Sequence, residues 1–122
     1  MTQSLAIQCT ELRHVYEERG LLGKSKQTVA LESVTFQVPK GVVFGLLGPN
    51  GAGKTTTVRV LATLLAPSDG TARVLGFDVG SQAQEVRRHI GLILGGDRGL
   101  YWRLTALENL IYFGALNGIG PR

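Results

Sequence analysis

The feature that most constrains this chain is a glycine-rich segment between two apolar stretches. Residues 48–55 read Gly-Pro-Asn-Gly-Ala-Gly-Lys-Thr and fit the pattern G-x-x-x-x-G-K-[ST]. The preceding residues 42–47 are almost wholly apolar, as a buried parallel strand requires. Val58, Leu61 and Leu65 then recur at the spacing of one helix face. In the order strand, glycine loop and helix, this pattern, known as Walker A, predicts a phosphate-binding loop.

Such a loop would hold a nucleoside triphosphate, whose roughly four negative charges suit backbone N–H groups at a helix N-terminus. We expect Gly48, Gly51 and Gly53 to take positive φ and let the main chain approach the phosphate oxygens. Lys54 is the expected catalytic residue, reaching the β and γ phosphates as a point charge, and Thr55 is expected to coordinate Mg²⁺. The nucleotide-binding residues predicted in the loop are Gly48, Asn50, Gly51, Ala52, Gly53, Lys54, Thr55 and Thr56. The alternative is a glycine-rich turn in which Lys54 is only a solvated surface cation.

Composition narrows the class of protein. Of the 122 residues, 43% are hydrophobic and 18% charged, which is typical of a globular chain. The net charge of +4 is modest and the basic residues are scattered, so no nucleic-acid surface is expected. Cys9 is the only cysteine, which excludes an internal disulfide and a cysteine-based metal cluster. With no signal-peptide pattern and no run of about 18 apolar residues, the sequence favours the cytoplasm.

An antiparallel β layer is predicted over residues 5–40. Val34, Phe36 and Val38 alternate with polar neighbours, and residues 12–16 offer a second extended stretch. The polar, glycine-punctuated residues 17–27 between them predict a loop. After the helix that follows the phosphate loop, residues 67–70 have the composition of a turn and residues 71–75 that of a strand.

Two further helices are predicted from their starting residues. Ser81 with Gln84 is a capping-box pattern for a helix running to about His89, and residues 90–94 then form a second candidate for a buried strand. Thr105 with Glu108 repeats the capping pattern. One face of this last helix contains Leu107, Leu110 and Ile111, and its end is expected near Asn117 and Gly118, after a loop at residues 95–99.

Motifs along essentially the whole chain resemble the nucleotide-binding domain of ATP-binding cassette (ABC) transporters. The residues that carry the resemblance are Tyr16, Ala30, Leu31, residues 34–36, Gly41, residues 45–56, 67–71, 74–79, 90–91 and 104–110. The Pro-Asn-Gly-Ala-Gly version of the loop is far more specific than the general pattern. Residues 95–104 look like the subset that serves drug and antibiotic exporters with membrane subunits of the ABC-2 type.

The resemblance implies ATP as the nucleotide and Tyr16 as the aromatic on which the adenine ring stacks. It also implies an α/β phosphate-loop NTPase fold of ABC type, with an antiparallel β layer, an incomplete and mostly parallel sheet, and flanking helices. The chain is then a single partial ATP-binding domain, 1–122. Its expected parts are a β layer at 1–40, a phosphate-loop core at 41–94, and a Q-loop region with the start of a helical subdomain at 95–122.

The sequence departs from the family pattern at the Q-loop. Where the family places a glutamine that reaches Mg²⁺ and the attacking water, this chain has Gly95, which has no side chain for either task. Asp97 is the nearest polar residue, although a loop Asp is more often a turn former. Contact with a membrane subunit near Gly95 to Leu104, through Arg98, Tyr101 and Trp102, is expected to survive this change.

The second departure is that the signature motif, Walker B strand, D-loop and switch histidine of the family do not occur in these 122 residues. A phosphate loop without them is expected to bind nucleotide well and to hydrolyse it poorly. His14 and His89 are no replacement, and His89 is expected to be a partly solvated imidazole on its helix.

The leading hypothesis is the N-terminal portion of an ABC exporter's ATP-binding subunit. In its intact form such a subunit would hydrolyse ATP to export a small molecule, as a dimer with a second ATP-binding subunit. It would sit on the inner face of the cell membrane, bound to a transmembrane permease subunit. One alternative is a free-standing ATP-binding module without turnover. Another is a small-molecule kinase, which lacks support because no lid-like segment follows and Arg87 and Arg88 are the only paired arginines.

Overall fold

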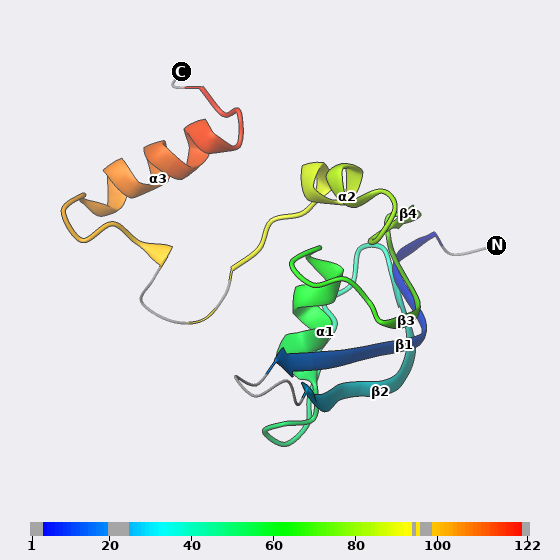
Figure 1. Ribbon diagram of the computed structural model, residues 1–122. Coiled ribbons are helices and arrows are strands. Elements are labelled where there is room, and N and C mark those ends of the chain that lie inside the picture. The colour runs from blue at the N-terminus through cyan, green and yellow to red at the C-terminus, as the bar shows by residue number, and fades with distance from the viewer. Residues whose placement is uncertain (1–3, 20–24, 94, 96–98, 121–122) are drawn as a thin grey trace. The chain divides into compact units, whose positions relative to one another are not determined.

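The computed structural model describes residues 4–19, 25–93, 95 and 99–120. It divides into two units, residues 1–91 and 92–122, and each unit is described by itself. The first unit contains, in chain order, β1 (Leu5–Arg19), β2 (Ser25–Pro39), α1 (Lys54–Leu61), β3 (Asp69–Val74), β4 (Phe77–Asp78) and α2 (Ala83–His89) (Figure 1). The second unit contains α3 (Ala106–Leu116). In the described residues, no helix has the length and apolar character needed to cross a membrane.

The predicted antiparallel β layer is confirmed. β1 and β2 pair from Leu5 with Pro39 to Arg19 with Ser25, and the full sheet has the order β2-β1-β3-β4. The loop predicted at residues 17–27 is wrong at both ends, because Glu17 pairs with Gln27 and accepts a hydrogen bond of 2.9 Å from its side-chain amide. Two strands that are exposed to solvent on both faces can pair without apolar side chains. The polar residues around Glu17 and Gln27 therefore did not end the strands.

The core lies between one face of the sheet and helices α1 and α2. The buried apolar side chains that form it are Cys9, Leu12, Leu31, Val60, Ala72, Val74, Val79 and Val86. Burial raises the pKa of the Cys9 thiol to about 11, so this thiol stays protonated at neutral pH and is unreactive. The core thus joins β1, β2 and β3 to the helix that follows the phosphate loop.

The helix after the phosphate loop is confirmed, but its buried face differs from the prediction. The buried residues of α1 are Thr56, Thr57 and Val60, whereas Val58 is exposed and Leu65 lies beyond the end of the helix. Leu61 and Leu65 still pack against the core. The i, i+3, i+7 pattern therefore located the helix but did not identify its buried face. The helix ends at Leu61, so Leu65 is not on it.

The two predicted parallel strands are absent from the described residues. Residues 42–47 and 90–93 have no strand pairing, and Val43, Leu47 and Ile93 are almost fully exposed. Leu94 lies outside the described residues. A buried parallel strand needs a paired strand beside it, and the sheet of the described residues contains only antiparallel pairs. These apolar segments therefore remain unpaired and largely uncovered.

α2 ends at His89 as predicted, but its start does not use the predicted capping box. The N-cap residue is Gln82 and makes no side-chain capping bond. The Ser81 hydroxyl and amide instead donate to the Asp78 carboxylate, which also accepts from the Gly80 amide. These donors, first the Ser81 amide, hold the pKa of Asp78 below its ordinary value. Ser81 thus stabilises the turn before the helix and not the helix end.

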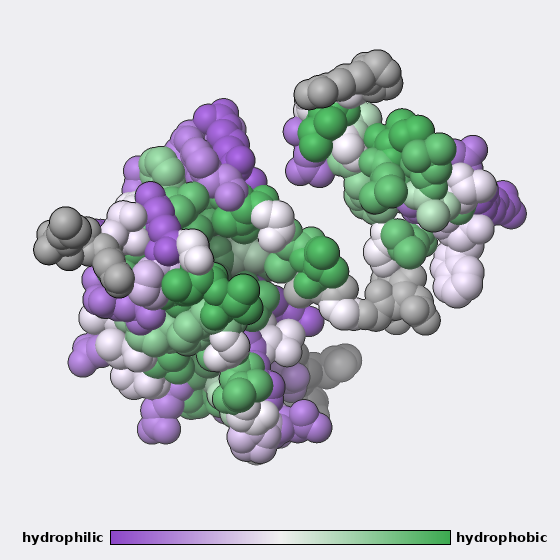
Figure 2. Space-filling model, turned by 180° about the vertical axis from the view of Figure 1, so that it is seen from behind, coloured by the Kyte–Doolittle hydropathy of each residue, from purple (hydrophilic) through white to green (hydrophobic). Residues whose placement is uncertain are grey.

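In the second unit, α3 begins with the capping box that the sequence predicts. The Thr105 hydroxyl accepts from the Glu108 amide, and the Glu108 carboxylate accepts from the Thr105 amide at 2.7 Å. The helix stops at Asn117, followed by Gly118 at φ +75°, which confirms the predicted end. The predicted apolar face of α3, with Leu107, Leu110 and Ile111, is exposed. Figure 2 shows hydrophobic residues gathered on the surface of this unit.

Candidate phosphate-binding site

The phosphate loop takes a backbone conformation that two of its glycines permit. Gly51 and Gly53 have φ of +86° and +91°. A side chain at Gly53 would also strike the Leu31 side chain and come within 2.7 Å of the Ala30 carbonyl oxygen. The positive φ predicted for Gly48 is wrong. A side chain at Gly48 would still be crowded, because its Cβ would lie 3.2 Å from the Ala52 Cβ. The loop is therefore pressed directly against β2.

The amides at the start of α1 are not used by the protein. Thr57 N donates to the Gly53 carbonyl at 2.8 Å, and Ala52 N donates to the Pro49 carbonyl at 3.2 Å. Within the described part of the chain, the backbone N–H groups of residue 51 and of residues 53–56 have no hydrogen-bond acceptor. No acidic residue lies in the first turn, and the N-cap Gly53 offers no side-chain acceptor. The positive end of this helix is thus left open to an anion.

Lys54 lies across the loop that precedes it. Its ammonium group donates to the carbonyl oxygens of Gly48 and, at 2.8 Å, of Pro49. Lys54 is partly exposed, and these two bonds hold its side chain against the loop. Held in this way, the charge lies beside the loop amides, where a bound polyphosphate would meet it.

The three threonines that follow have different surroundings. Thr55 is exposed, Thr56 is buried, and Thr57 is buried with its hydroxyl donating to the Gly53 carbonyl at 2.9 Å. The Thr57 hydroxyl therefore reinforces the first turn of α1. The exposed Thr55 hydroxyl is a hard oxygen donor of the kind Mg²⁺ prefers. One protein hydroxyl fits this ion, which keeps several waters and takes further ligands from substrate phosphates.

A cavity of about 360 Å³ joins the loop to β1 and β2. The residues that line it are Tyr16, Thr28, Val29, Ala30, Asn50, Gly51, Gly53, Lys54, Thr55 and Thr56. The structure thus brings Tyr16 to the same cavity as six of the predicted loop residues, while Gly48 and Ala52 do not line it. Neither His14 nor His89 lines it, and the His89 ring instead stacks on Phe77 at 5.3 Å.

The sequence missed Thr28, Val29 and Ala30 as cavity residues. They line the cavity with Tyr16, since Tyr16 pairs with Thr28 and Val15 with Val29 in the β1–β2 ladder. That register follows several irregularities between Leu5 and Val15, which no local pattern predicts.

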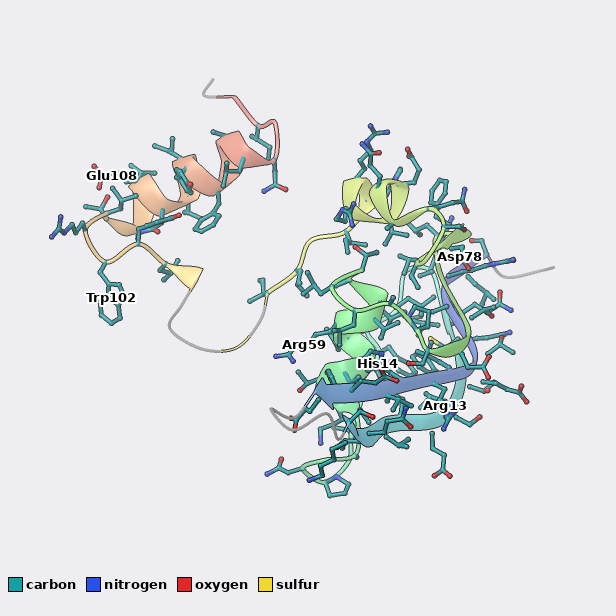
Figure 3. All side chains as sticks on the ribbon, in the orientation of Figure 1. Arg13, His14, Arg59, Asp78, Trp102 and Glu108 are labelled. Carbon is teal, nitrogen blue, oxygen red and sulfur yellow. The ribbon has the colours of Figure 1, made fainter. Side chains whose placement is uncertain are left out.

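The predicted docking segment, Gly95 to Leu104, belongs to the second unit. Trp102 is 86% exposed, and in Figure 3 its side chain points away from α3. The buried Asn109 side chain fixes the segment to α3 by donating to the carbonyls of Tyr101, Leu104 and Thr105 and accepting from the Tyr101 amide. Asp97 and Arg98 lie outside the described residues. Hydrogen bonds to Asn109 thus hold the backbone of this segment, and its aromatic side chains, Tyr101 and Trp102, are exposed to solvent.

The fold and the loop define a phosphate-loop α/β domain, and comparison with known proteins gives its family. The ABC transporter family matches residues 31–118, which is most of the chain. The chain belongs to this family, which confirms the resemblance carried by its motifs.

Relatives of this chain are named as ATP-binding proteins. The ABC transporter ATP-binding protein NatA of Bacillus subtilis is 51% identical over 101 residues, which are 83% of this chain and 41% of NatA. The daunorubicin/doxorubicin resistance ATP-binding protein DrrA of Streptomyces peucetius is 46% identical over 109 residues, 89% of this chain and 33% of DrrA. The chain thus spans about two fifths of NatA and a third of DrrA.

A solved structure confirms the fold class. The dimeric post-hydrolysis state of the ATP-binding cassette MJ0796, bound to ADP and Pi, matches with a TM-score of 0.74 at 22% identity. The match covers 95% of this chain and 50% of that one. The ABC-type α/β fold is therefore present although the two predicted parallel strands are not formed here.

Proposed function

We propose that this chain is the N-terminal portion of an ABC exporter's ATP-binding subunit and that it binds Mg-ATP in the cavity between Tyr16 and the phosphate loop. The observation that carries the proposal is the cavity itself. It has an aromatic ring on one wall, while a helix N-terminus on another presents amides that the protein does not use. This combination suits a ligand with a flat base at one end and a polyanion at the other.

Each group has a role in this proposal. The amides of residues 51 and 53–56 hold the phosphate oxygens, and Lys54 neutralises charge at the β and γ phosphates. Thr55 would supply one ligand to Mg²⁺, and the ion when bound would offset the negative charge of the phosphates. Tyr16 stacks on adenine, with Val29 as apolar wall beside it.

Hydrolysis and export belong to the whole protein in this proposal. Relatives named for drug resistance and for multidrug transport support a subunit that powers export of a small molecule. We place the intact protein at the inner face of the cell membrane, as a dimer of ATP-binding subunits with a transmembrane permease subunit. The exposed aromatic residues Tyr101 and Trp102 would form part of the permease contact. The expected organisation as one partial domain, 1–122, stays a prediction.

The main alternative is a free-standing module that binds ATP without turnover. Gly95, with no side chain in the position of the Q-loop glutamine, is the residue that favours it. Restoring glutamine with Gly95→Gln in the longest natural form of the protein separates the two. An ATPase that is already active at Gly95 excludes the binding-only module, whereas activity found in neither form excludes the transporter ATPase.

Calorimetric titration of Mg-ATP into the 122-residue chain tests the binding claim. Lys54→Ala should weaken binding by about tenfold or more, because it removes charge-assisted hydrogen bonds to phosphate. Lys40→Ala is the matched control, since Lys40 is an exposed cation outside the cavity, and it should leave affinity unchanged. A wild-type chain that takes up no Mg-ATP at millimolar concentration overturns the proposal.

A thermal melt gives an independent measurement. Mg-ATP at about 100 times its dissociation constant should stabilise the chain by about 2.7 kcal/mol. We expect a clear shift, because the unpaired apolar segments at residues 42–47 and 90–93 make the chain marginal on its own. At the same ATP concentration, Lys54→Ala with tenfold weaker binding should be stabilised by only about 1.4 kcal/mol. Equal shifts for both proteins would contradict the assigned site.

A further inference from the structure

The Tyr16 ring, on which the base would stack, packs against the imidazole ring of His14. The His14 imidazole and the Tyr16 ring have centroids 4.6 Å apart and planes at 83°, an edge-to-face pair. His14 is only 8% exposed, whereas Tyr16 is partly exposed at the cavity. Perpendicular aromatic pairs of this kind restrict both rings, so His14 limits the orientations open to Tyr16.

His14 is itself held by a set of hydrogen bonds that we call the clip. His14 Nδ1 lies 2.9 Å from the Ala66 carbonyl oxygen. Because a carbonyl oxygen can only accept a hydrogen bond, Nδ1 is the donor. Beside it, Ser68 N donates to the Arg13 carbonyl at 2.8 Å, and Val15 N donates to the Ser68 hydroxyl at 3.0 Å. The clip fixes the three residues of β1 that immediately precede Tyr16.

The clip acts where β1 is irregular. The pairing of β1 with β2 shifts register between Leu12 and His14 and again between His14 and Val15. Such irregularities re-aim side chains and are common beside binding sites. Regular pairing begins at Val15 and includes Tyr16, so the clip holds β1 at the point where the irregular stretch meets the ladder that contains Tyr16.

The clip also joins β1 to the segment that follows α1. Ala66 lies in the segment between α1 and β3, just beyond the helix whose first residues form the phosphate loop. His14 thus links the base-binding ring to the far end of the phosphate-binding helix, and Figure 3 labels it on β1.

We propose that His14 is a positioning residue that sets the orientation of Tyr16 and so the affinity for the nucleotide base. This inference rests on the proposed function, because it requires a base to stack on Tyr16. His14 does not touch the ligand, since it does not line the cavity and its Nε2 is buried without a partner in the described residues. Its influence passes through the ring of Tyr16 and leaves the phosphate loop unchanged.

The test compares two ligands on the same chain. Binding of Mg-ATP and of inorganic tripolyphosphate with Mg²⁺ is measured by calorimetry for wild type, His14→Ala, His14→Asn and His14→Phe. We expect His14→Ala to weaken ATP by about fivefold and to leave tripolyphosphate unchanged. Asn retains a donor for Ala66 and Phe retains a ring beside Tyr16, so each should recover part of the loss.

A double-mutant cycle with Tyr16→Ala separates positioning from general destabilisation. If His14 acts through Tyr16, the fivefold effect should vanish in the Tyr16→Ala background. Val86→Ala is the matched control, because Val86 is fully buried in the core and distant in sequence from the clip. It should lower the unfolding midpoint without favouring tripolyphosphate over ATP.

The outcomes are distinct. Equal losses of ATP and tripolyphosphate in the His14 variants, or a His14→Ala effect that persists without the Tyr16 ring, overturn the positioning role and leave the proposed function standing. If the wild-type chain binds tripolyphosphate and ATP equally well, the base contributes nothing to binding. That result overturns the positioning role of His14. A wild-type chain that binds neither ligand overturns the proposed function as well.

Discussion

Helices α1 and α3 begin in opposite ways, and the difference separates a binding site from a structural end. α1 starts at Gly53, which provides no side-chain acceptor, and its first turn contains no acidic residue. α3 starts at Thr105, and the capping box with Glu108 satisfies its amides. An uncapped N-terminus is less stable by about 1 kcal/mol, so retaining one makes sense where a ligand completes it. Under the proposed function, the phosphates of the nucleotide would supply the cap that α1 lacks.

The largest expected effect comes from filling the space that the α1 start requires. Gly53→Ala places a side chain at φ +91° and against Leu31 and the Ala30 carbonyl, so we expect a loss of about 3 kcal/mol or more in the free energy of unfolding. Urea denaturation measures it. Gly51→Ala is the matched control, because Gly51 has a similar φ of +86° but open space around a Cβ. It should cost only about 1 kcal/mol.

If both glycine variants lose the same stability, backbone strain alone explains the loop, and the close contact between Gly53 and β2 has no importance of its own. If Gly53→Ala is harmless, the loop is not pressed against β2 as the structure has it.

The next effect should appear at the other helix. Thr105→Ala removes the capping hydroxyl of α3 and should cost about 1 kcal/mol of helix stability. Amide hydrogen exchange of residues 106–116 measures this locally, because protection reports the free energy of opening. Thr105→Ser keeps the hydroxyl and is the matched control. Unchanged exchange in Thr105→Ala would show that the capping bonds contribute nothing to α3.

The two capping patterns also show how far the sequence predicts local structure. Ser81 with Gln84 and Thr105 with Glu108 have the same spacing, yet only the second forms a capping box. Ser81 follows Asp78, whose carboxylate accepts from the Ser81 hydroxyl and amide and so draws the serine into a turn. The pattern gives the candidates, and a neighbouring acceptor decides which helix end is capped.

The candidate site was predictable where its parts are close in sequence. The phosphate loop follows from residues 48–56, since its glycines, lysine and threonines act through one continuous backbone. Tyr16 came from a resemblance to a family, because nothing local says which partner a strand aromatic faces. Thr28 to Ala30 could not be predicted, because their place depends on the β1–β2 register around the irregularities near His14.

The predicted parallel strands failed for a different reason. Residues 42–47 have the apolar run of a buried strand, and Phe44 does stack on Phe36 of β2 at 5.4 Å. Apolarity shows that a segment is suited to burial, but pairing also needs a neighbouring strand with unused hydrogen-bonding groups. β1, β2 and β3 have such neighbours among the described residues, and residues 42–47 do not.

A smaller effect should result from giving α1 the acid that it lacks. Thr55→Glu places a carboxylate in the first turn and should stabilise the ligand-free chain by about 0.5 kcal/mol through the helix dipole. The same charge should repel a polyphosphate and remove Mg-ATP binding. Thr55→Gln is the matched control, since it has the same shape without the charge. The comparison is contradicted if Thr55→Glu lowers stability relative to Thr55→Gln, because the amides of α1 would then not attract an anion.

The smallest effect should be a pH dependence confined to α3. The Thr105 amide, and then its hydroxyl, donate to Glu108 and hold the pKa of this carboxyl below its ordinary value of 4.5. Because the folded pKa is lowered, the contribution of Glu108 is present above about pH 4.5 and is lost as the pH falls through the lower folded value. Protection of the α3 amides should therefore stay constant from pH 7 to about 5 and fall below about 4. Glu108→Gln keeps an acceptor for Thr105 and has no charge to titrate, so it should remove this acid loss. An equal acid loss in wild type and Glu108→Gln would assign the titration to other carboxyls and leave the cap of α3 independent of charge.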